Sequence, residues 1–249
     1  MNEPPFLWVY MYFLCIALAT AVPCGLGAAL KLAGNAAAGT RQVVRSAAGL
    51  LFGWLAIVAL LGRLDVFRPA VDRPIPYIAF AIVIPVACGA RLINRWNLAV
   101  TILRAAPQGW LVGVQCYRGA GAIFLILYGM HFMPGVFAVP AGIGDVLVGL
   151  LALPVAALYR KGSRIGNAAV VAWNALGILD LVAAITLGFL SAPTRFQVLA
   201  HDAPNAMIGS SPAALIPTFA VPLSIILHLA SLKKIALEKQ DAGQAAAAN

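Results

Sequence analysis

Long apolar runs dominate the chain, and short polar stretches separate them. Seven runs have about the 20 residues that an α-helix needs to cross a bilayer, and the third is the shortest. This pattern predicts an all-α fold, a polytopic integral membrane helix bundle with seven transmembrane helices in residues 1–237. The tail, residues 238–249, is polar and then rich in alanine, and we expect it to be disordered. The predicted spans are 6–30, 44–61, 75–92, 109–130, 135–159, 166–190 and 213–232.

A weaker run, residues 94–107, lies between the third and fourth spans. Arg95 and Arg104 are placed to face lipid headgroups, and Trp96 lies at the boundary, where aromatic rings are favoured. A segment of this length and mixed character is typical of a helix that lies in the membrane interface. We therefore predict a short interfacial helix here.

The composition fits a bilayer better than water, because 62% of the residues are hydrophobic and only 10% are charged. A soluble domain has about 25% charged residues. The formal charge of +9 would suggest nucleic acid in a soluble protein, but here the basic residues lie in short loops. We therefore expect no nucleic-acid partner. The expected partners are the lipid bilayer and anionic lipids at its cytoplasmic face, with a second copy or another membrane subunit as candidates.

The basic residues also predict the orientation, because Lys and Arg are enriched in cytoplasmic loops. With the amino terminus outside, twelve of them lie on the inner side and four on the outer side. We therefore expect a multi-pass protein of the cell membrane with a cytoplasmic carboxyl terminus. No basic residue precedes the first run, so it is expected to be a retained helix and not a cleaved signal peptide. The inner residues are Lys31, Arg41, Arg45, Arg91, Arg95, Arg104, Arg160, Lys161, Arg164, Lys233, Lys234 and Lys239, and the outer ones are Arg63, Arg68, Arg73 and Arg195.

Three ionisable side chains, Arg118, Asp145 and Asp180, lie inside predicted spans. Each costs roughly 2.5–3.5 kcal/mol at a helix centre, so such residues are usually functional. At 1.5 Å per residue they lie about 13, 15 and 21 Å from the ends at which their spans begin, near the middle of the membrane. Each shares a helix face with small residues, so we expect these faces to pack against one another. The faces are Gln115, Arg118, Gly121 and Ala122; Gly142, Asp145 and Gly149; and Trp173, Gly177 and Asp180.

Prolines are expected to disturb two of the spans. Pro140, with Gly142 and Gly144 close by, is predicted to loosen the fifth helix near Asp145 and to release backbone groups at mid-membrane. Pro217 and Pro222 are expected to kink the last span.

The charges of the three ionisable residues do not cancel, since one arginine faces two aspartates and leaves a net charge of −1. A proton on one Asp, a bound cation or a cationic ligand would neutralise it, which provides a basis for proton coupling or cation binding. The alternative is structural. In that case an Arg–Asp pair locks the helices, and the other Asp is protonated or hydrogen-bonded to Asn174 or Gln115.

Asn174, Gln115 and His228 complete the candidate binding residues. Asn174 is either a hydrogen-bond donor between helices or a ligand. His228 is either a satisfied core residue or a proton relay. Ser224 lies four residues before His228, which is compatible with a Ser–His protease dyad, but no third group or oxyanion motif accompanies the pair.

Several classes of protein are excluded by what the chain lacks. The sequence has no CxxC, HExxH, GxGxxG or P-loop motif. No predicted span contains a lysine, which excludes a retinal Schiff base. Only His228 lies within a span, which excludes bis-histidine haem ligation. We therefore expect no cofactor, no metal and no enzymatic activity.

Three functions remain. The first is a small-solute transporter or permease with Arg118, Asp145 and Asp180 at a mid-membrane site, where protonation of one Asp switches the charge. The second is a non-catalytic subunit or assembly factor of a membrane complex, in which the polar cluster only specifies helix packing. The third is a membrane sensor of a small ligand or lipid whose inner basic residues dock a soluble partner.

Overall fold

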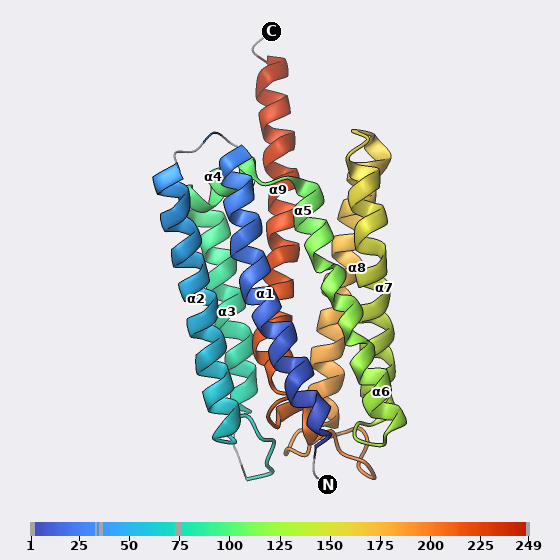
Figure 1. Cartoon of the computed structure of the whole chain (residues 1–249). Helices are drawn as coiled ribbons and strands as arrows, with labels where there is room; N and C mark the ends of the chain where they lie inside the picture. Colours follow the sequence, from blue (N-terminus) through green and yellow to red (C-terminus); the bar gives the residue numbers. More distant parts are fainter. Residues whose placement is uncertain (1–2, 33, 35–36, 73–75, 248–249) are drawn as a thin grey trace.

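A computed structural model of the chain describes all residues except 1–2, 33, 35–36, 73–75 and 248–249. Every regular element in this part of the chain is a helix, and seven helices are long and apolar enough to cross a membrane. The helices stand side by side in one bundle, with the two chain ends at opposite ends of it (Figure 1). The predicted all-helical fold with seven such helices is therefore confirmed for the described residues.

Four of the long helices begin and end within three residues of the predicted spans, and the second long helix begins seven residues before the predicted residue 44. The third predicted span begins at residue 75, which lies outside the described residues. The segment for which a short interfacial helix was predicted contains the helix α4, Asn97–Ala105. The five long helices are α1 (Pro5–Leu32), α2 (Ala37–Arg63), α3 (Tyr77–Arg95), α7 (Gly135–Tyr159) and α8 (Arg164–Ser191).

The fourth span differs from the prediction because it is not a continuous α-helix. It consists of α5 (Gln108–Gly113), the 3₁₀ helix η1 (Val114–Ala122) and α6 (Ile123–Gly129). The loosened backbone was expected around Pro140, but α7 continues through that residue. A 3₁₀ helix has three residues per turn, so residues three apart lie on one face. Gln115, Arg118 and Gly121 therefore share a face of η1.

The last span consists of the π-helix η3 (Ile216–Ala220) followed by α9 (Val221–Ala247). The short 3₁₀ helix η2 (Met207–Gly209) precedes it. The expected disordered tail is helical up to Ala247, and the final two residues lie outside the described part. Its Ala, Glu, Lys and Gln residues favour a helix. An ion pair of 3.0 Å between Arg104 Nη2 and Asp241 Oδ1 also connects this part of α9 to α4.

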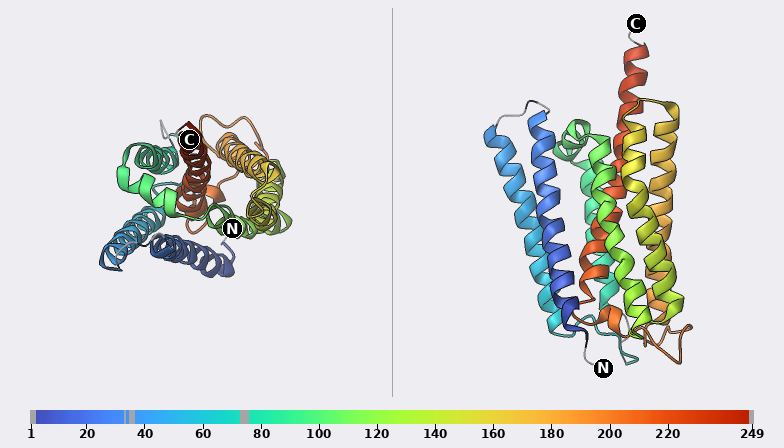
Figure 2. Two further views of the ribbon diagram at one scale, coloured as in Figure 1. Left: turned by 90° about the horizontal axis from the view of Figure 1, so that it is seen from above. Right: turned by 45° about the vertical axis from the view of Figure 1, so that its right-hand side comes forward.

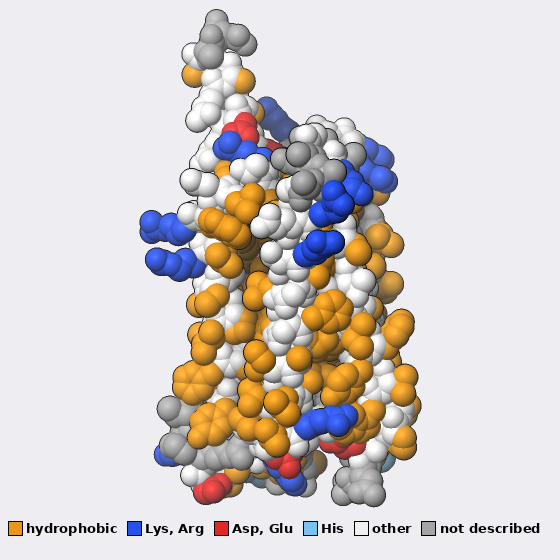
Figure 3. All heavy atoms as spheres, turned by 60° about the vertical axis from the view of Figure 1, so that its left-hand side comes forward, with side chains coloured by type: hydrophobic (Ala, Val, Ile, Leu, Met, Phe, Trp, Pro, Cys, Tyr) orange, Lys and Arg blue, Asp and Glu red, His pale blue; other side chains and the backbone are white. Residues whose placement is uncertain are grey.

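Helix α9 is the centre of the bundle (Figure 2). In its most apolar stretch 61% of the residues are buried, whereas the corresponding value for α3 is 6%. Apolar side chains cover the flank of the bundle, and charged side chains gather toward its two ends (Figure 3). This distribution is the one that a bilayer requires, because hydrocarbon accepts apolar side chains and excludes charge.

Candidate functional site

Arg118 projects from η1 into the interior of the bundle, where its side chain is 1% exposed. Its Nε donates to Asp145 Oδ1 of α7 at 2.8 Å, and its Nη2 lies 2.7 Å from the same oxygen. Nη2 also donates to Asp180 Oδ2 of α8. One guanidinium therefore bridges carboxylates from two neighbouring helices, as the sequence predicted for helices four, five and six.

The remaining nitrogen of Arg118 is directed toward α8 and α9. Nη1 lies 3.3 Å from both the Gly177 carbonyl oxygen and His228 Nε2. All three guanidinium nitrogens therefore have acceptors. Because an arginine side chain always stays protonated in proteins, it acts here as a permanent donor and a permanent positive charge.

Glycines allow the helices to approach this closely. A Cβ atom added at Gly121 would overlap Asp145, and one added at Gly144 would overlap Asp180. Gly177 has the same relation to the ring of His228. Small residues at an interface let two membrane helices pack closely. The glycines therefore mark the helix faces on which the charged side chains meet.

The hydrogen bonds of His228 define its protonation state. Arg118 has only donors, so His228 Nε2 must accept, and the ring proton must be on Nδ1. His228 Nδ1 then donates to Asn174 Oδ1 at 2.9 Å. Asn174 Nδ2 in turn donates to the Val170 carbonyl and to Ser231 Oγ, each at 2.8 Å. The imidazole is therefore neutral in this arrangement.

The hydrogen bonds continue toward the end of the bundle that holds the carboxyl terminus. Gln108 Nε2 of α5 donates to Ser231 Oγ at 2.6 Å. Gln108, Ser231, Asn174, His228 and Arg118 therefore form an unbroken series, which we call the polar chain, and it ends on the two carboxylates. The sequence reasoning missed Gln108 and Ser231. The signal for Ser231 was its position three residues after His228, on the same face of the helix.

Two candidates from the sequence have other surroundings than expected. Gln115 is fully buried, yet both of its amide atoms lack a hydrogen-bond partner among the described residues, so it does not bond an aspartate. Ser224 pairs with the Tyr117 hydroxyl, while both ring nitrogens of His228 have other partners. The Ser224–His228 dyad is therefore absent. The four-residue spacing of Ser224 and His228 does not orient the two side chains toward each other.

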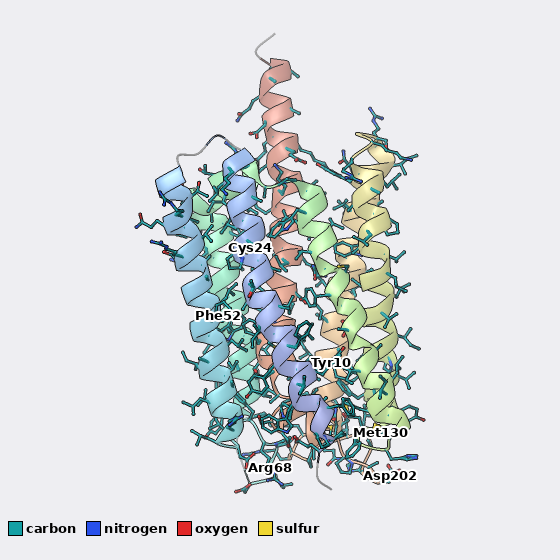
Figure 4. All side chains as sticks on the ribbon, in the orientation of Figure 1. Tyr10, Cys24, Phe52, Arg68, Met130 and Asp202 are labelled. Carbon is teal, nitrogen blue, oxygen red and sulfur yellow. The ribbon has the colours of Figure 1, made fainter. Side chains whose placement is uncertain are left out.

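Each carboxylate contacts Arg118 through one oxygen. None of the described residues forms a hydrogen bond with Asp145 Oδ2 or Asp180 Oδ1. The Asp145 side chain is 17% exposed, against 11% for that of Asp180. Helix α1 also reaches this region, where the Tyr10 hydroxyl donates to the Ala120 carbonyl at 2.5 Å (Figure 4). Asp145 and Asp180 are therefore both largely buried, and each keeps one oxygen that no described residue bonds.

Two cavities approach the cluster from opposite ends of the bundle. The first, which we call the N-side cavity, has a volume of about 110 Å³ and extends from the loop at Phe67 to Asp145. The second, the C-side cavity, has a volume of about 1190 Å³ and is lined by residues that include Gln108, Arg160 and Lys234. The polar chain lies between the two cavities.

In the described part of the chain, no group of three or more His, Cys, Asp or Glu side chains is placed to hold a metal ion. The site contains two carboxylates, Asp145 and Asp180, but only one cation, Arg118, pairs with them. It can therefore bind a proton or a single positive charge.

The family model "Domain of unknown function (DUF8737)" matches residues 75–236, and the chain belongs to this family. The matched segment contains the whole polar chain and both carboxylates. No curated protein and no solved structure matches the chain.

Proposed function

We propose that this member of the family is a transporter or permease of small solutes in the cell membrane, coupled to protons. Arg118, Asp145 and Asp180 form its mid-membrane binding site, and Asn174, Gln115 and His228 belong to the surrounding polar shell. The observation that carries the proposal is the excess carboxylate beside a cavity. The protein moves its solute without converting it chemically.

The charge of the cluster supports coupling. With Arg118 positive, His228 neutral and both aspartates ionised, the net charge is −1. Uncompensated charge is very costly in a medium of low dielectric constant, so the cluster takes up a proton or a cation. A site that holds one or the other, and not both, couples their movements across the membrane.

The two cavities support alternating access. Asp145 lines the N-side cavity, whereas the C-side cavity ends on Gln108, the first residue of the polar chain. The hydrogen bonds from Gln108 to His228 close the path between the carboxylates and the C side. Transport requires a second state in which these bonds open and the N-side cavity closes. Discontinuous helices at mid-membrane are typical of transporters, and η1 places such a segment at Arg118.

The orientation in this proposal has the amino terminus outside and the carboxyl terminus in the cytoplasm. The basic residues of the short loops support it, because they gather at the carboxyl-terminal end of the bundle. Anionic lipids of the inner leaflet are the partners that these residues would contact. The N-side cavity then opens to the outside.

Flux measurements in liposomes test the proposal. Purified protein is reconstituted, a pH gradient is applied, and uptake of labelled solutes is followed for wild type, Asp145→Asn and Asp180→Asn. We expect wild-type flux to follow the pH gradient and both variants to lose it. The matched control is Asp202→Asn, the same change in an exposed loop. Flux at the wild-type level in both interior variants would contradict the proposal.

A second function, a non-catalytic subunit or assembly factor, is favoured by one observation. Every nitrogen of Arg118 is already engaged, which is the arrangement of a structural lock between helices. Under this alternative, Asp145→Asn and Asp180→Asn lower the unfolding temperature, and a stoichiometric partner protein copurifies. No solute flux accompanies either observation.

A further inference from the structure

The N-side cavity is lined mostly by apolar side chains. Aromatic rings of Tyr77, Phe124 and Phe137 contribute to its walls. Among its described lining residues, Asp145 is the only carboxylate, and Arg68 is the only other charged side chain. The Arg68 side chain is 66% exposed and belongs to the loop at the cavity mouth. A ligand that reaches the deep end therefore meets hydrocarbon on its sides and one negative group ahead of it.

One oxygen of this carboxylate has no hydrogen-bond partner among the described residues. Arg118 contacts Asp145 through Oδ1, and no described residue bonds Oδ2. One positive charge at Oδ2 brings the net charge of the cluster to zero. An anion would add to the excess charge, and a neutral solute would leave it uncompensated.

The walls also select among cations. A hard inorganic cation needs several oxygen ligands to replace its hydration shell. These walls offer almost none besides Asp145. An organic cation brings its own apolar surface, which the aromatic and aliphatic walls bury, and aromatic faces attract positive charge. The volume of about 110 Å³ far exceeds the roughly 10–15 Å³ that one water needs, so it admits a small molecule.

Resting on the transport function proposed above, we infer that the substrate is a small monovalent organic cation, an alkylammonium or arylammonium. Its ammonium group binds Asp145 Oδ2 from the N-side cavity, and the proton held on the carboxylate pair leaves to the solvent. The ammonium ion replaces the proton, so the net charge of the cluster does not change. The O–H bond of the protonated carboxyl group is the only covalent bond that breaks. The ionisable groups around Asp145 are Arg118 and Tyr117 of η1, Asp180 of α8, His228 of α9 and Tyr10 of α1.

Calorimetric titration of the purified full chain in detergent tests the inference. Benzylammonium is the probe, with benzyl alcohol and benzoate as neutral and anionic molecules of similar shape. Repeating the titration in buffers of different ionisation enthalpy counts the protons released. We expect wild type to release about one proton for each benzylammonium bound, since one charge replaces the other, and to bind the alcohol and benzoate at least tenfold more weakly.

Two variants locate the binding. Asp145→Asn is expected to bind benzylammonium at least tenfold more weakly and to release no proton, while Asp202→Asn behaves as wild type. Ala184→Leu fills the cavity wall while both aspartates remain in place, and it also weakens binding, which keeps the test informative if Asp145→Asn misfolds. Its matched control is Ala175→Leu on the exposed face of α8.

The outcomes separate the inference from the function on which it rests. Equal binding of benzyl alcohol and benzylammonium, or binding without proton release, would overturn the cation assignment. If benzylammonium does not bind but a neutral or anionic solute shows flux that depends on Asp145 and the pH gradient, the substrate class is wrong and the transport function stands. Absence of both binding and any such flux would overturn both.

Discussion

The two cavities differ in chemistry as well as in position. The N-side cavity is small and apolar, and it reaches an interior carboxylate. The C-side cavity is about ten times larger, is bordered by charged groups such as Arg160, Lys234 and Glu238, and stops at Gln108. Of these two cavities, only the N-side cavity is lined by a residue of the cluster, Asp145.

This difference shows what the polar chain does. Its hydrogen bonds join α5, α8, α9 and η1, so side chains that bond one another fill the space between the C-side cavity and the carboxylates. Gln108 Oε1 is buried without a hydrogen-bond partner among the described residues. A fully satisfied polar network specifies one arrangement of helices, and a partly satisfied one is costly. The polar chain is therefore the element that keeps the two cavities apart. The predictions below test the polar chain and the helix contacts around it, in decreasing order of expected effect.

Loss of Arg118 has the largest expected effect. Arg118→Gln leaves two interior carboxylates without their cation, which costs about 3–5 kcal/mol of unfolding free energy when a buried pair is broken in this way. The measurement is unfolding in detergent followed by circular dichroism. Arg195→Gln, in an exposed loop, is the control and is expected to stay within about 0.5 kcal/mol of wild type. An Arg118→Gln protein as stable as this control would show that the cluster is not held by the guanidinium.

A methyl group between η1 and α7, at Gly121, has the next largest effect. Gly121→Ala places a Cβ atom where the Asp145 side chain lies, so η1 and α7 must move apart. Overpacking of this kind costs about 1–3 kcal/mol. Gly119→Ala is the matched control on the same 3₁₀ helix, because a Cβ atom there meets open space. Equal stability of the two variants would mean that η1 does not approach α7 as described.

Removing the hydroxyl at the C-side end has a smaller effect. Ser231→Ala takes away the acceptor that Gln108 and Asn174 share, and both donors keep a backbone carbonyl as a second acceptor. We expect a loss of about 1–2 kcal/mol and faster hydrogen exchange of the α9 amides near His228. Ser46→Ala on the exposed face of α2 should change neither quantity. If the α9 amides of Ser231→Ala exchange hydrogen at the wild-type rate, Ser231 does not help to close the path from the C side.

The ion pair between α4 and the end of α9 has the smallest expected effect. Both partners, Arg104 and Asp241, are about half exposed, so water screens their attraction. Asp241→Asn should cost about 0–1 kcal/mol and leave solute flux unchanged. Thermal unfolding and the liposome assay measure the two quantities, with Asp202→Asn as the comparison. A loss of flux would mean that the end of α9 takes part in the transport cycle.

The lengths of the apolar runs were sufficient to locate the long helices, because a helix that crosses a bilayer needs about 20 apolar residues. The charged members of the site were also predictable, since charge in hydrocarbon is rare and glycines marked the faces on which it lies. Ser231 and Gln108 were not, because serine is common in membrane helices and Gln108 lies at the edge of its run. The 3₁₀ geometry of η1 was not predicted either, because its sequence has no feature that sets it apart from an α-helix. Gly119 and Gly121 resemble the small residues of α7, which remains α-helical despite Pro140.

The account depends most directly on the claim that the interior carboxylates open to the N side. Single cysteines at Ala184, in the N-side cavity, and at Ala156, in the C-side cavity, test it in a chain whose native cysteines are replaced by alanine. A small cationic thiol reagent is added to either side of oriented vesicles. We predict that Ala184→Cys reacts only from the amino-terminal side and is protected by benzylammonium, and that Ala156→Cys reacts only from the other side. Reaction of Ala184→Cys from the carboxyl-terminal side alone would contradict the account.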